Sequence, residues 1–302
     1  MATKTAATTA PSLPRLMHSR SASLSTMVWR ELTHNPTAML GLIILVIFVI
    51  GAVGAAYIAP YDPYELDFSS SLLPINSPGH LLGTDDLGRD FFSRIIYGSQ
   101  VSLVVGLIVV GISSTIGVTL GALAGYFGGI LDNIIMRTVD ILFAFPFLIL
   151  AIAIVGVVGP SLVNMMIILG AITWIEYARV VRGLVLSLRG REFVIATRAL
   201  GASHFRIITR HILPNCFGIV SVQATFGVAS AILAAATLSF LGMGAQPPTP
   251  EWGAMLSEGQ KFIRQVPVLA IAPGIAVMLL VIAINLVGDA LRDALDPFVR
   301  GR

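Results

Sequence analysis

Charged side chains are scarce in this chain of 302 residues: they make up 12% of it, whereas hydrophobic residues make up 56%. This balance lies outside the range of soluble globular domains. Apolar runs recur that are long enough to cross the hydrocarbon layer, which takes about 20 residues of helix. The composition therefore excludes an ordinary soluble fold and predicts an integral membrane protein in contact with lipid. A net charge of only +3 gives no footprint for nucleic acid.

Lysine and cysteine are nearly absent. With only Lys4 and Lys261, the chain contains no phosphate-binding loop of the form GxxxxGK[ST], so we expect no nucleotide hydrolysis and no cofactor on this chain. The single Cys216 excludes an internal disulfide and a cysteine metal cluster, and we expect it to be a small buried side chain. The metal motif HExxH and the nucleophile motif GxSxG are missing as well. The sequence thus predicts neither catalytic residues nor a metal site.

Hydrophobicity predicts six membrane-spanning segments, each helical because lipid offers no partners to free backbone groups. Pro146 and Pro273 fall inside two of these segments. Each predicts a kink, which is either a bend repaired by neighbouring helices or a moving hinge. The expected fold class is therefore all-α, with about six transmembrane helices. The predicted spans cover residues of about 38–59, 101–124, 138–158, 161–180, 216–241 and 268–288.

Basic residues predict the orientation, because cytoplasmic segments of membrane proteins are enriched in lysine and arginine. With the N-terminus inside, 15 of the 19 basic residues fall in cytoplasmic segments, and only Arg89, Arg94, Lys261 and Arg264 fall in outer loops. Both termini are then cytoplasmic. The chain divides into a tail at 1–30, a first transmembrane helix with its outer loop at 31–99, a core domain with five spans at 100–290, and a second cytoplasmic tail at 291–302.

The stretch GAQPPTPEWG, residues 244–253, falls between the fifth and sixth spans and therefore on the outer face. Proline removes backbone donors and fixes dihedral angles, so this loop is expected to keep a shape without secondary structure. Trp252 suits the headgroup layer of the membrane. Two hypotheses remain for the loop: a fixed surface for docking or for closing an outer gate, or a rigid connector only.

Glycines recur at four-residue steps in the second span. Gly117, Gly121, Gly125 and Gly129 would form one stripe on a helix, which is typical of close contact with another helix. The spacing leaves open whether that partner helix belongs to the same chain.

Few acids lie within or beside the spans. Asp140, Glu176 and Asp289 are all predicted near the inner membrane interface, where a charge is less costly than at the midplane. Arg179 follows Glu176 by three residues, a spacing typical of an ion pair on one helix. The sequence therefore favours a structural role for Glu176 over an ion relay.

The most informative polar segment is residues 187–215, in which five arginines alternate with apolar residues. The pattern predicts two short helices broken near Gly201, the second capped by Ser203 and stopped before Pro214. One hypothesis is a basic loop that only fixes topology. An amphipathic pattern instead favours a helix whose apolar face docks in a groove of a soluble partner.

The residues Gly201, Ala202 and Ser203, followed by the run Leu213 to Asn215, resemble the cytoplasmic coupling motif of permease subunits of ATP-binding-cassette importers. The opening of the motif differs, since Ile195, Ala196 and Thr197 stand where Glu, Ala, Ala are often found, and Glu192 lies one turn earlier. The stretches LLGTDDLGRDFFSRIIYGSQVSL (81–103), LSFLGMGAQPPTPEWGAML (238–256) and NLVGDALRDALDP (285–297) resemble the second permease subunit of dipeptide and oligopeptide importers. The likeness covers nearly everything after residue 30. It departs at Ala235, where such subunits often carry an acid.

This resemblance to the peptide/nickel group of permeases implies the type I importer permease fold in a bacterial inner membrane. It implies a homologous permease as heterodimeric partner, two cytoplasmic ATPase subunits that carry ATP and magnesium, and a periplasmic or lipid-anchored substrate-binding protein. The cargo would be dipeptides or short peptides, with nickel, glutathione or longer oligopeptides as alternatives. Rival classes are a membrane enzyme, which the missing catalytic groups disfavour, and a scaffold, which needs no amphipathic basic segment.

The resemblance also assigns residues. Contacts with the ATPase are expected from Arg191, Glu192, Ala196, Gly201, Ala202, Ser203, Leu213 and Pro214. Contacts on the outer face are expected from Thr84, Asp85, Arg89, Asp90, Gln246, Pro247, Pro248, Glu251 and Trp252. Among these, Asp85, Asp86 and Arg89 predict a local network at a helix start rather than a substrate contact.

Overall fold

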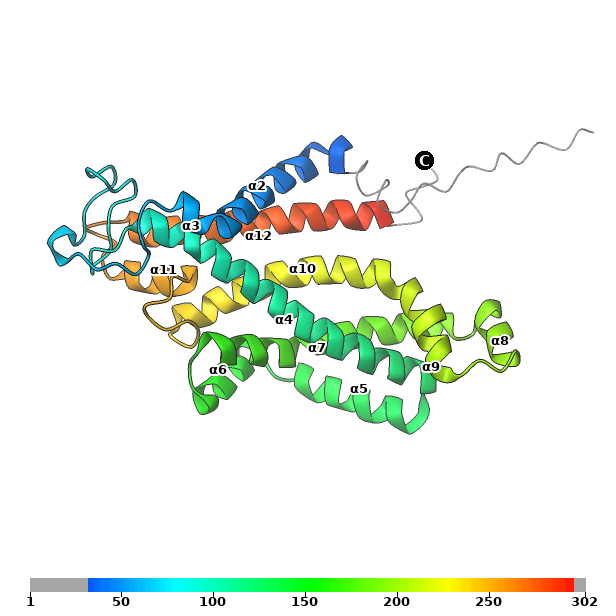
Figure 1. Ribbon diagram of the computed structural model, residues 1–302. Coiled ribbons are helices and arrows are strands. Elements are labelled where there is room, and N and C mark those ends of the chain that lie inside the picture. Colours follow the sequence, from blue (N-terminus) through cyan, green and yellow to red (C-terminus); the bar gives the residue numbers. More distant parts are fainter. Residues whose placement is uncertain (1–31, 296–302) are drawn as a thin grey trace, which may run out of the picture.

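The computed structural model describes residues 32–295, and the described chain is an elongated bundle of helices (Figure 1). The predicted N-terminal tail at 1–30 and the last part of the predicted C-terminal tail lie outside the described residues. The long helices are α2 (Pro36–Val53), α4 (Phe91–Phe127), α7 (Leu162–Leu188), α10 (Leu213–Phe240) and α12 (Val268–Leu295). The shorter helices are α3 (Ala55–Ile58), η1 (Phe68–Ser70), α5 (Gly129–Phe143), α6 (Phe147–Val158), α8 (Glu192–Ala199), α9 (His204–Ile207), η2 (Ile208–Ile212) and α11 (Trp252–Gln260).

The two ends of the bundle differ in what they carry (Figure 1). One end holds α8 and α9, together with the start of α2 and the end of α12; we call it the α8 end. The opposite end holds α3, α11 and the long connection between α3 and α4; we call it the α11 end. Because the described chain starts and finishes at the α8 end, it crosses the length of the bundle an even number of times.

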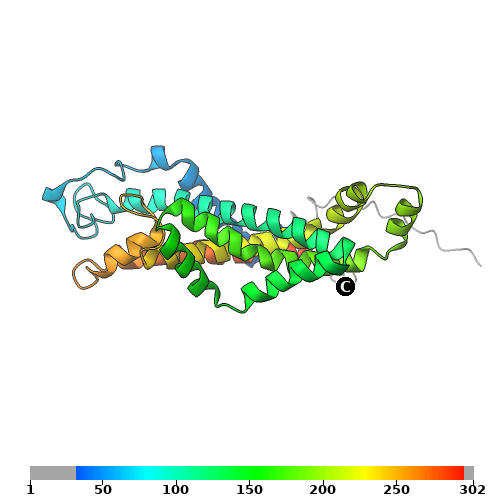
Figure 2. The same ribbon diagram turned by 90° about the horizontal axis from the view of Figure 1, so that it is seen from below.

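Within residues 32–295, five helical runs are long and apolar enough to cross a membrane, and the bent pair α5 and α6 makes a sixth if it counts as one span. About six spans is therefore confirmed. A straight third span over 138–158 is wrong, because α5 and α6 meet at 91°, a bend that Figure 2 shows from below. Pro146 begins the second arm with an extended ψ of 120°, since its ring and missing N–H prevent a continuous helix there.

The other two prolines behave differently. Helix α12 continues through Pro273, which is buried inside it. The predicted stop before Pro214 is wrong, because α9, η2 and α10 run on as one helical stretch. Its middle part is a π-helix in which the N–H of Leu213 bonds to the carbonyl of Ile208, five residues back. This wider turn leads into α10 with Pro214 in its first turn, where a missing N–H costs little.

Several helices extend beyond the predicted hydrocarbon length. Helix α4 begins at Phe91 rather than near 101, α7 continues to Leu188 rather than 180, and α12 continues to Leu295, so residues 291–295 are helical rather than tail. Hydropathy marks only the part of a helix that lies in lipid, whereas backbone hydrogen bonds carry the helix on into the polar layers.

The glycine stripe of α4 lies against α7, so its partner helix belongs to the same chain. A methyl group at Gly121 would lie 2.5 Å from the carbonyl oxygen of Ala178, and Gly117 and Gly125 are similarly close to α7. Gly129 does not share the stripe, because Gly128 ends α4 with a φ of 68° and a methyl group at Gly129 would meet open space. The small residues thus allow the two backbones to approach closely.

Candidate functional site

The α8 end contains the predicted coupling segment as a helical hairpin. Helix α8 ends in a glycine motif: Gly201, with a φ of 80°, donates to the carbonyl of Arg198, and Ala202 donates to that of Thr197. Such a reversal favours glycine, since other residues are strained at positive φ. Ser203 then caps α9 by accepting from the N–H of Arg206. The predicted break and the predicted cap are both present.

The hairpin is fixed to the bundle by one buried face. Val194 of α8 and Ile207 of α9 are fully buried, in a cluster with Val181 and Val185 of α7. The hydroxyl of Tyr126 lies 2.9 Å from Nδ1 of His204, which adds a polar tie to the end of α4. The position of the hairpin is therefore set by apolar packing on its own chain.

The hairpin also exposes large apolar side chains that its own chain leaves uncovered. Phe193 is 42% exposed, Ile195 57%, Leu200 88% and Phe205 77%. In both views the hairpin extends beyond the ends of α4 and α5, away from the long apolar helices (Figures 1 and 2). An apolar surface of this kind outside the lipid-length spans is typical of a protein-binding site.

The predicted coupling residues lie in this hairpin or, for Leu213 and Pro214, at the start of α10, and their roles stay predictions. Exposed positions are Arg191, Glu192, Ala196, Gly201, Ser203 and Pro214, while Ala202 and Leu213 are half-buried. Sequence reasoning did not single out Leu200 or Phe205 as contact residues. The sequence features that could have identified them are the apolar Leu200 next to the predicted break at Gly201 and the apolar Phe205 just after the predicted cap Ser203.

Two arginines connect the end of α7 to the neighbouring helices. Arg182 donates from Nε and Nη2 to both carboxylate oxygens of Asp132 in α5, at 2.5 and 2.7 Å. Arg189 donates from Nη1 to the carbonyl of Gly125, at 3.0 Å. A bidentate pair of this kind fixes the relative position of two helices. A force applied at the hairpin would therefore reach α4 and α5 through α7.

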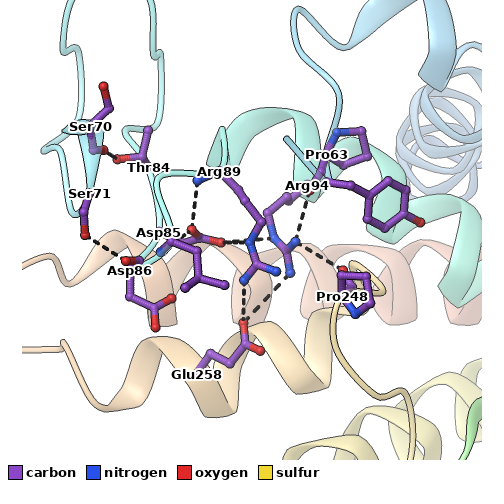
Figure 3. A network of polar contacts seen from close by, with 12 residues as sticks. Pro63, Ser70, Ser71, Thr84, Asp85, Asp86, Arg89, Arg94, Pro248 and Glu258 are labelled. Carbon is purple, nitrogen blue, oxygen red and sulfur yellow. Dashed lines mark hydrogen bonds and ion pairs between the residues drawn. The ribbon is translucent and has the colours of Figure 1, made fainter. Parts of the chain in front are cut away.

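At the α11 end, two buried arginines form a network with two acids (Figure 3). Nε of Arg89 lies 2.6 Å from Oδ2 of Asp85, and Arg94 lies 3.5 Å from the same oxygen. Both guanidinium groups also approach Glu258 of α11, at 3.5 and 3.9 Å. Arg94 donates in addition to the carbonyls of Pro63 and Pro248.

This network joins two regions that are far apart in the sequence: the connection after α3 with the start of α4, and the proline loop with α11. Neither the contact of Arg89 with Glu258 nor the hydrogen bond from Arg94 to the carbonyl of Pro248 was identified from the sequence. The residues of these pairs are 169 and 154 positions apart in the chain. Burial raises the pKa of the Glu258 carboxyl, while the neighbouring Arg94 and Arg89 oppose that rise.

The predicted helix-start network is present in altered form. The cap of α4 is Asp90, which accepts from the N–H and hydroxyl of Ser93 at 2.8 and 2.7 Å. Asp85 instead accepts from the backbone of Leu87 and Arg89. The hydroxyl of Thr84 donates to the carbonyl of Ser70. These side chains are buried, so Thr84, Asp85, Arg89 and Asp90 do not offer a surface on this chain.

The proline loop divides into a buried and an exposed part. Trp252 is not in the headgroup layer as predicted: it is fully buried and donates from Nε1 to the carbonyl of Ile95 at 3.0 Å. Glu251 is also buried and caps α11 by accepting from the N–H of Ala254. Burial raises the pKa of its carboxyl. Only Gln246, Pro247 and Pro248 of the predicted contact residues are exposed.

Among the acids, the predicted pair of Glu176 with Arg179 is wrong. Arg179 lies 3.3 Å from Asp140 of α5 instead. Because α7 continues to Leu188, Glu176 lies near the middle of the helix rather than near its inner end. It lines a cavity of about 210 Å³ between α4, α6, α7 and α10.

Comparison with known proteins shows which families this chain resembles. Residues 117–301 match the family model "Binding-protein-dependent transport system inner membrane component", and residues 23–74 match the N-terminal transmembrane domain of oligopeptide transport permease C.

The dipeptide transport system permease protein DppC of Haemophilus influenzae is 43% identical over 89% of this chain and 93% of its own. DppC of Alkalihalophilus pseudofirmus is 46% identical over 89% of this chain and 90% of its own. The glutathione transport system permease protein GsiD of Escherichia coli O157:H7 is 44% identical over 90% of both. A solved structure of the methionine transporter MetNI in inward-facing conformations shares the fold, with a TM-score of 0.53 and 22% identity over 68% of this chain and 97% of that one.

Proposed function

This chain belongs to the family of binding-protein-dependent transport system inner membrane components, and on that premise we propose that it forms half of the translocation pathway of an importer for dipeptides or short peptides. The relatives that support this cargo carry it in their names, at 43% and 46% identity over nearly the whole chain. The chain itself is a membrane permease subunit and not an enzyme. ATP and magnesium would be bound by partner subunits.

We place the α8 end in the cytoplasm. Arg191, Arg198, Arg206 and Arg210 are exposed there, whereas at the α11 end Arg89 and Arg94 are buried in ion pairs and the exposed basic residues are Lys261 and Arg264. Exposed basic residues remain preferentially on the cytoplasmic side of a membrane. The start of α2 and the end of α12 lie at the same end, so both termini would be cytoplasmic.

The α8–α9 hairpin carries the proposal that ATPase subunits drive this permease. Its buried face is fixed to α7, while its apolar side chains Leu200 and Phe205 are uncovered. A groove on an ATPase subunit would cover these side chains, as an amphipathic helix fills a hydrophobic groove. Movement of the hairpin on ATP binding would then be transmitted through α7 to the transmembrane helices.

Two further partners complete the proposal. A homologous permease would pair with this chain as a heterodimer and provide the other half of the pathway. A periplasmic or lipid-anchored substrate-binding protein would deliver peptide at the α11 end, where Gln246, Pro247 and Pro248 are exposed on a loop that Arg94 holds in place. The connector hypothesis for this loop remains the alternative.

The coupling proposal is tested by Phe205→Asp and Leu200→Asp, made singly in the complete transporter. Each places a charge in the apolar contact without disturbing the buried face of the hairpin. We expect the amount of ATPase that co-purifies with the permease, and peptide uptake, to fall at least tenfold. Ile263→Asp, at a 50% exposed apolar position of the α11 end, is the matched control and should retain the ATPase. Normal co-purification and uptake in both hairpin variants would contradict the coupling role.

Glutathione is a second candidate cargo, favoured by the 44% identity to GsiD. Uptake of a radiolabelled dipeptide into vesicles containing the complete transporter, competed with unlabelled dipeptide or glutathione, separates the two. Competition by dipeptide at much lower concentration than glutathione is expected. Competition by glutathione at the lower concentration would identify glutathione as the cargo.

A further inference from the structure

Glu176 places a carboxyl group near the middle of α7, beside a cavity that Val109 and Ser113 also line near the middle of α4. Fourteen residues of α7 precede it and twelve follow it, which corresponds to about 21 Å and about 18 Å of helix. An ionisable side chain near the middle of a membrane-spanning helix is costly and is usually found facing a protein interior or a water-filled cavity. Its position therefore calls for a reason beyond packing.

No cation of the described chain neutralises this carboxylate. No lysine, arginine or histidine among residues 32–295 forms an ion pair with Glu176, and the nearest basic residue along the helix, Arg179, is paired with Asp140. Its polar contact is Nε2 of Gln223, which donates to Oε2 at 3.5 Å from α10. A neutral amide donor leaves most of the negative charge uncompensated.

The cavity beside Glu176 is lined by polar side chains as well as by apolar ones. Thr173 lies one turn before Glu176, and Tyr177, Ser113 and Ser230 also line the space of about 210 Å³. The hydroxyl of Tyr177 donates to the carbonyl of Gln223, and it fits there because residue 227 is glycine. Such a volume holds several water molecules or a small polar group.

This cavity is accessible from one side of the bundle. Glu176 and Ser230 are exposed on this chain, although α7 and α10 belong to helical runs that are long and apolar enough to cross a membrane. Lipid contact would leave the carboxylate without solvation, so this side must face a polar path or a partner. If the pathway runs between two permeases, as proposed above, this side of the chain would line it.

We propose that Glu176 binds the ammonium group of the peptide during its passage through the membrane. The proposal rests on the proposed function, because it requires a peptide cargo. A free amino terminus has an ordinary pKa of about 7.7 to 8.0 and so is mostly charged at neutral pH. A carboxylate is its natural partner, and the hydroxyls and the Gln223 amide offer neutral contacts to the rest of the peptide backbone. Glu176 acts as a specificity-determining residue with no covalent step.

Cysteine labelling tests whether the site lies on the cargo path. Glu176→Cys is made in a Cys216→Ala background of the complete transporter, and its reaction with a water-soluble, negatively charged methanethiosulfonate is timed with and without transported dipeptide. Ile167→Cys, on the opposite face of α7 and 52% exposed, is the matched control. We expect Glu176→Cys to react at least tenfold faster than the control and to be slowed at least fivefold by dipeptide. Equal rates, or no effect of dipeptide, would overturn the proposal.

The charge requirement is tested by uptake. Glu176→Gln should lower dipeptide uptake at least tenfold while ATP hydrolysis and subunit composition stay normal. Modification of Glu176→Cys with the negatively charged reagent should restore uptake, and a positively charged reagent of similar size should not. Loss of subunit assembly in Glu176→Gln would assign the carboxylate to a cation of the partner permease and overturn the proposal. Normal uptake in Glu176→Gln would overturn it too.

Dipeptide uptake by the unmodified transporter distinguishes failure of the proposed function from failure of the inference about Glu176. If it imports no dipeptide, the cargo assignment is wrong. If it imports dipeptide and the Glu176 variants behave like the control, only the inference about Glu176 fails.

Discussion

The two ends of the bundle use polar and apolar residues in opposite ways. At the α11 end, Arg89 and Arg94 are buried and satisfied by acids and carbonyls of the same chain. At the α8 end, the hairpin arginines Arg191, Arg198 and Arg206 are exposed, and so are Leu200 and Phe205. A region whose polar groups are paired internally is built to keep its shape. A region that leaves apolar side chains uncovered is built to receive another protein.

The largest expected effect on stability is at the α11 end. Arg94→Met removes a cation that is 2% exposed and leaves Asp85 and Glu258 with less compensation. Breaking a buried ion pair by removing one partner costs about 3–5 kcal/mol. We therefore expect a clear fall in the thermal unfolding temperature of the detergent-purified complex. Arg264→Met, at an exposed arginine of the same end, should leave it unchanged; equal effects would contradict the network.

A smaller effect is expected at the hairpin turn of the α8 end. Gly201→Ala meets no atom within 4 Å, but its φ of 80° remains, and a left-handed conformation costs a non-glycine residue about 1–2 kcal/mol. We expect reduced coupling, measured as uptake per ATP hydrolysed, with the bundle intact. Gly183→Ala, also in open space within α7, is the matched control and should be neutral. If Gly183→Ala reduced coupling as much as Gly201→Ala does, the result would contradict a specific role of the hairpin turn in coupling.

The cap of α9 carries a still smaller expected effect. Ser203→Ala removes the acceptor for the N–H of Arg206, and loss of a cap costs about 1 kcal/mol. In the first turn of α9, hydrogen exchange at the amide of Arg206 should become faster, while exchange at Val181 and Val185 of α7 changes little. Unchanged exchange at that first turn would show that the cap adds nothing to the hairpin.

The smallest expected effect on stability is at the tip of the proline loop. Gln246→Ala removes two donors to the carbonyls of Gly242 and Gly244 at an exposed position, where most substitutions change the free energy of unfolding by about 0.5 kcal/mol or less. Uptake at limiting concentrations of the substrate-binding protein distinguishes the two hypotheses for the loop. A fall supports docking, and an unchanged rate supports the connector.

Local sequence predicted the α8 end well because its signals are local. Glycine after a helix, serine before the next and alternating apolar residues predict the turn, the cap and the two helices without any distant contact. The exception is the continuation of the helix through Pro214. It depends on a π-helical turn whose hydrogen bond from Leu213 to Ile208 replaces the usual one, and residue preferences do not signal it.

The α11 end was predicted poorly because its contacts are distant. The resemblance predicted Glu251 and Trp252 as contacts on the outer face, and Trp252 was expected in the headgroup layer. The buried positions of Arg94, Glu251 and Trp252 depend instead on α11 folding back against the start of α4. The position of Glu176 was misjudged for a related reason, since the end of the apolar run was taken as the end of the helix.

By itself, the sequence determined that this chain is a membrane protein, that it crosses the membrane about six times as helices, and that its basic residues are distributed unevenly between the two sides. These properties follow from lipid, which accepts neither free backbone groups nor unpaired charges, and each can be evaluated within a short window of residues. The tertiary structure alone decided which charges are buried together, where the third span breaks into two arms, and that Glu176 lies beside a cavity deep in the bundle. Those outcomes depend on which helices meet, and that is set by the summed packing of segments up to about 170 residues apart, as between Arg89 and Glu258.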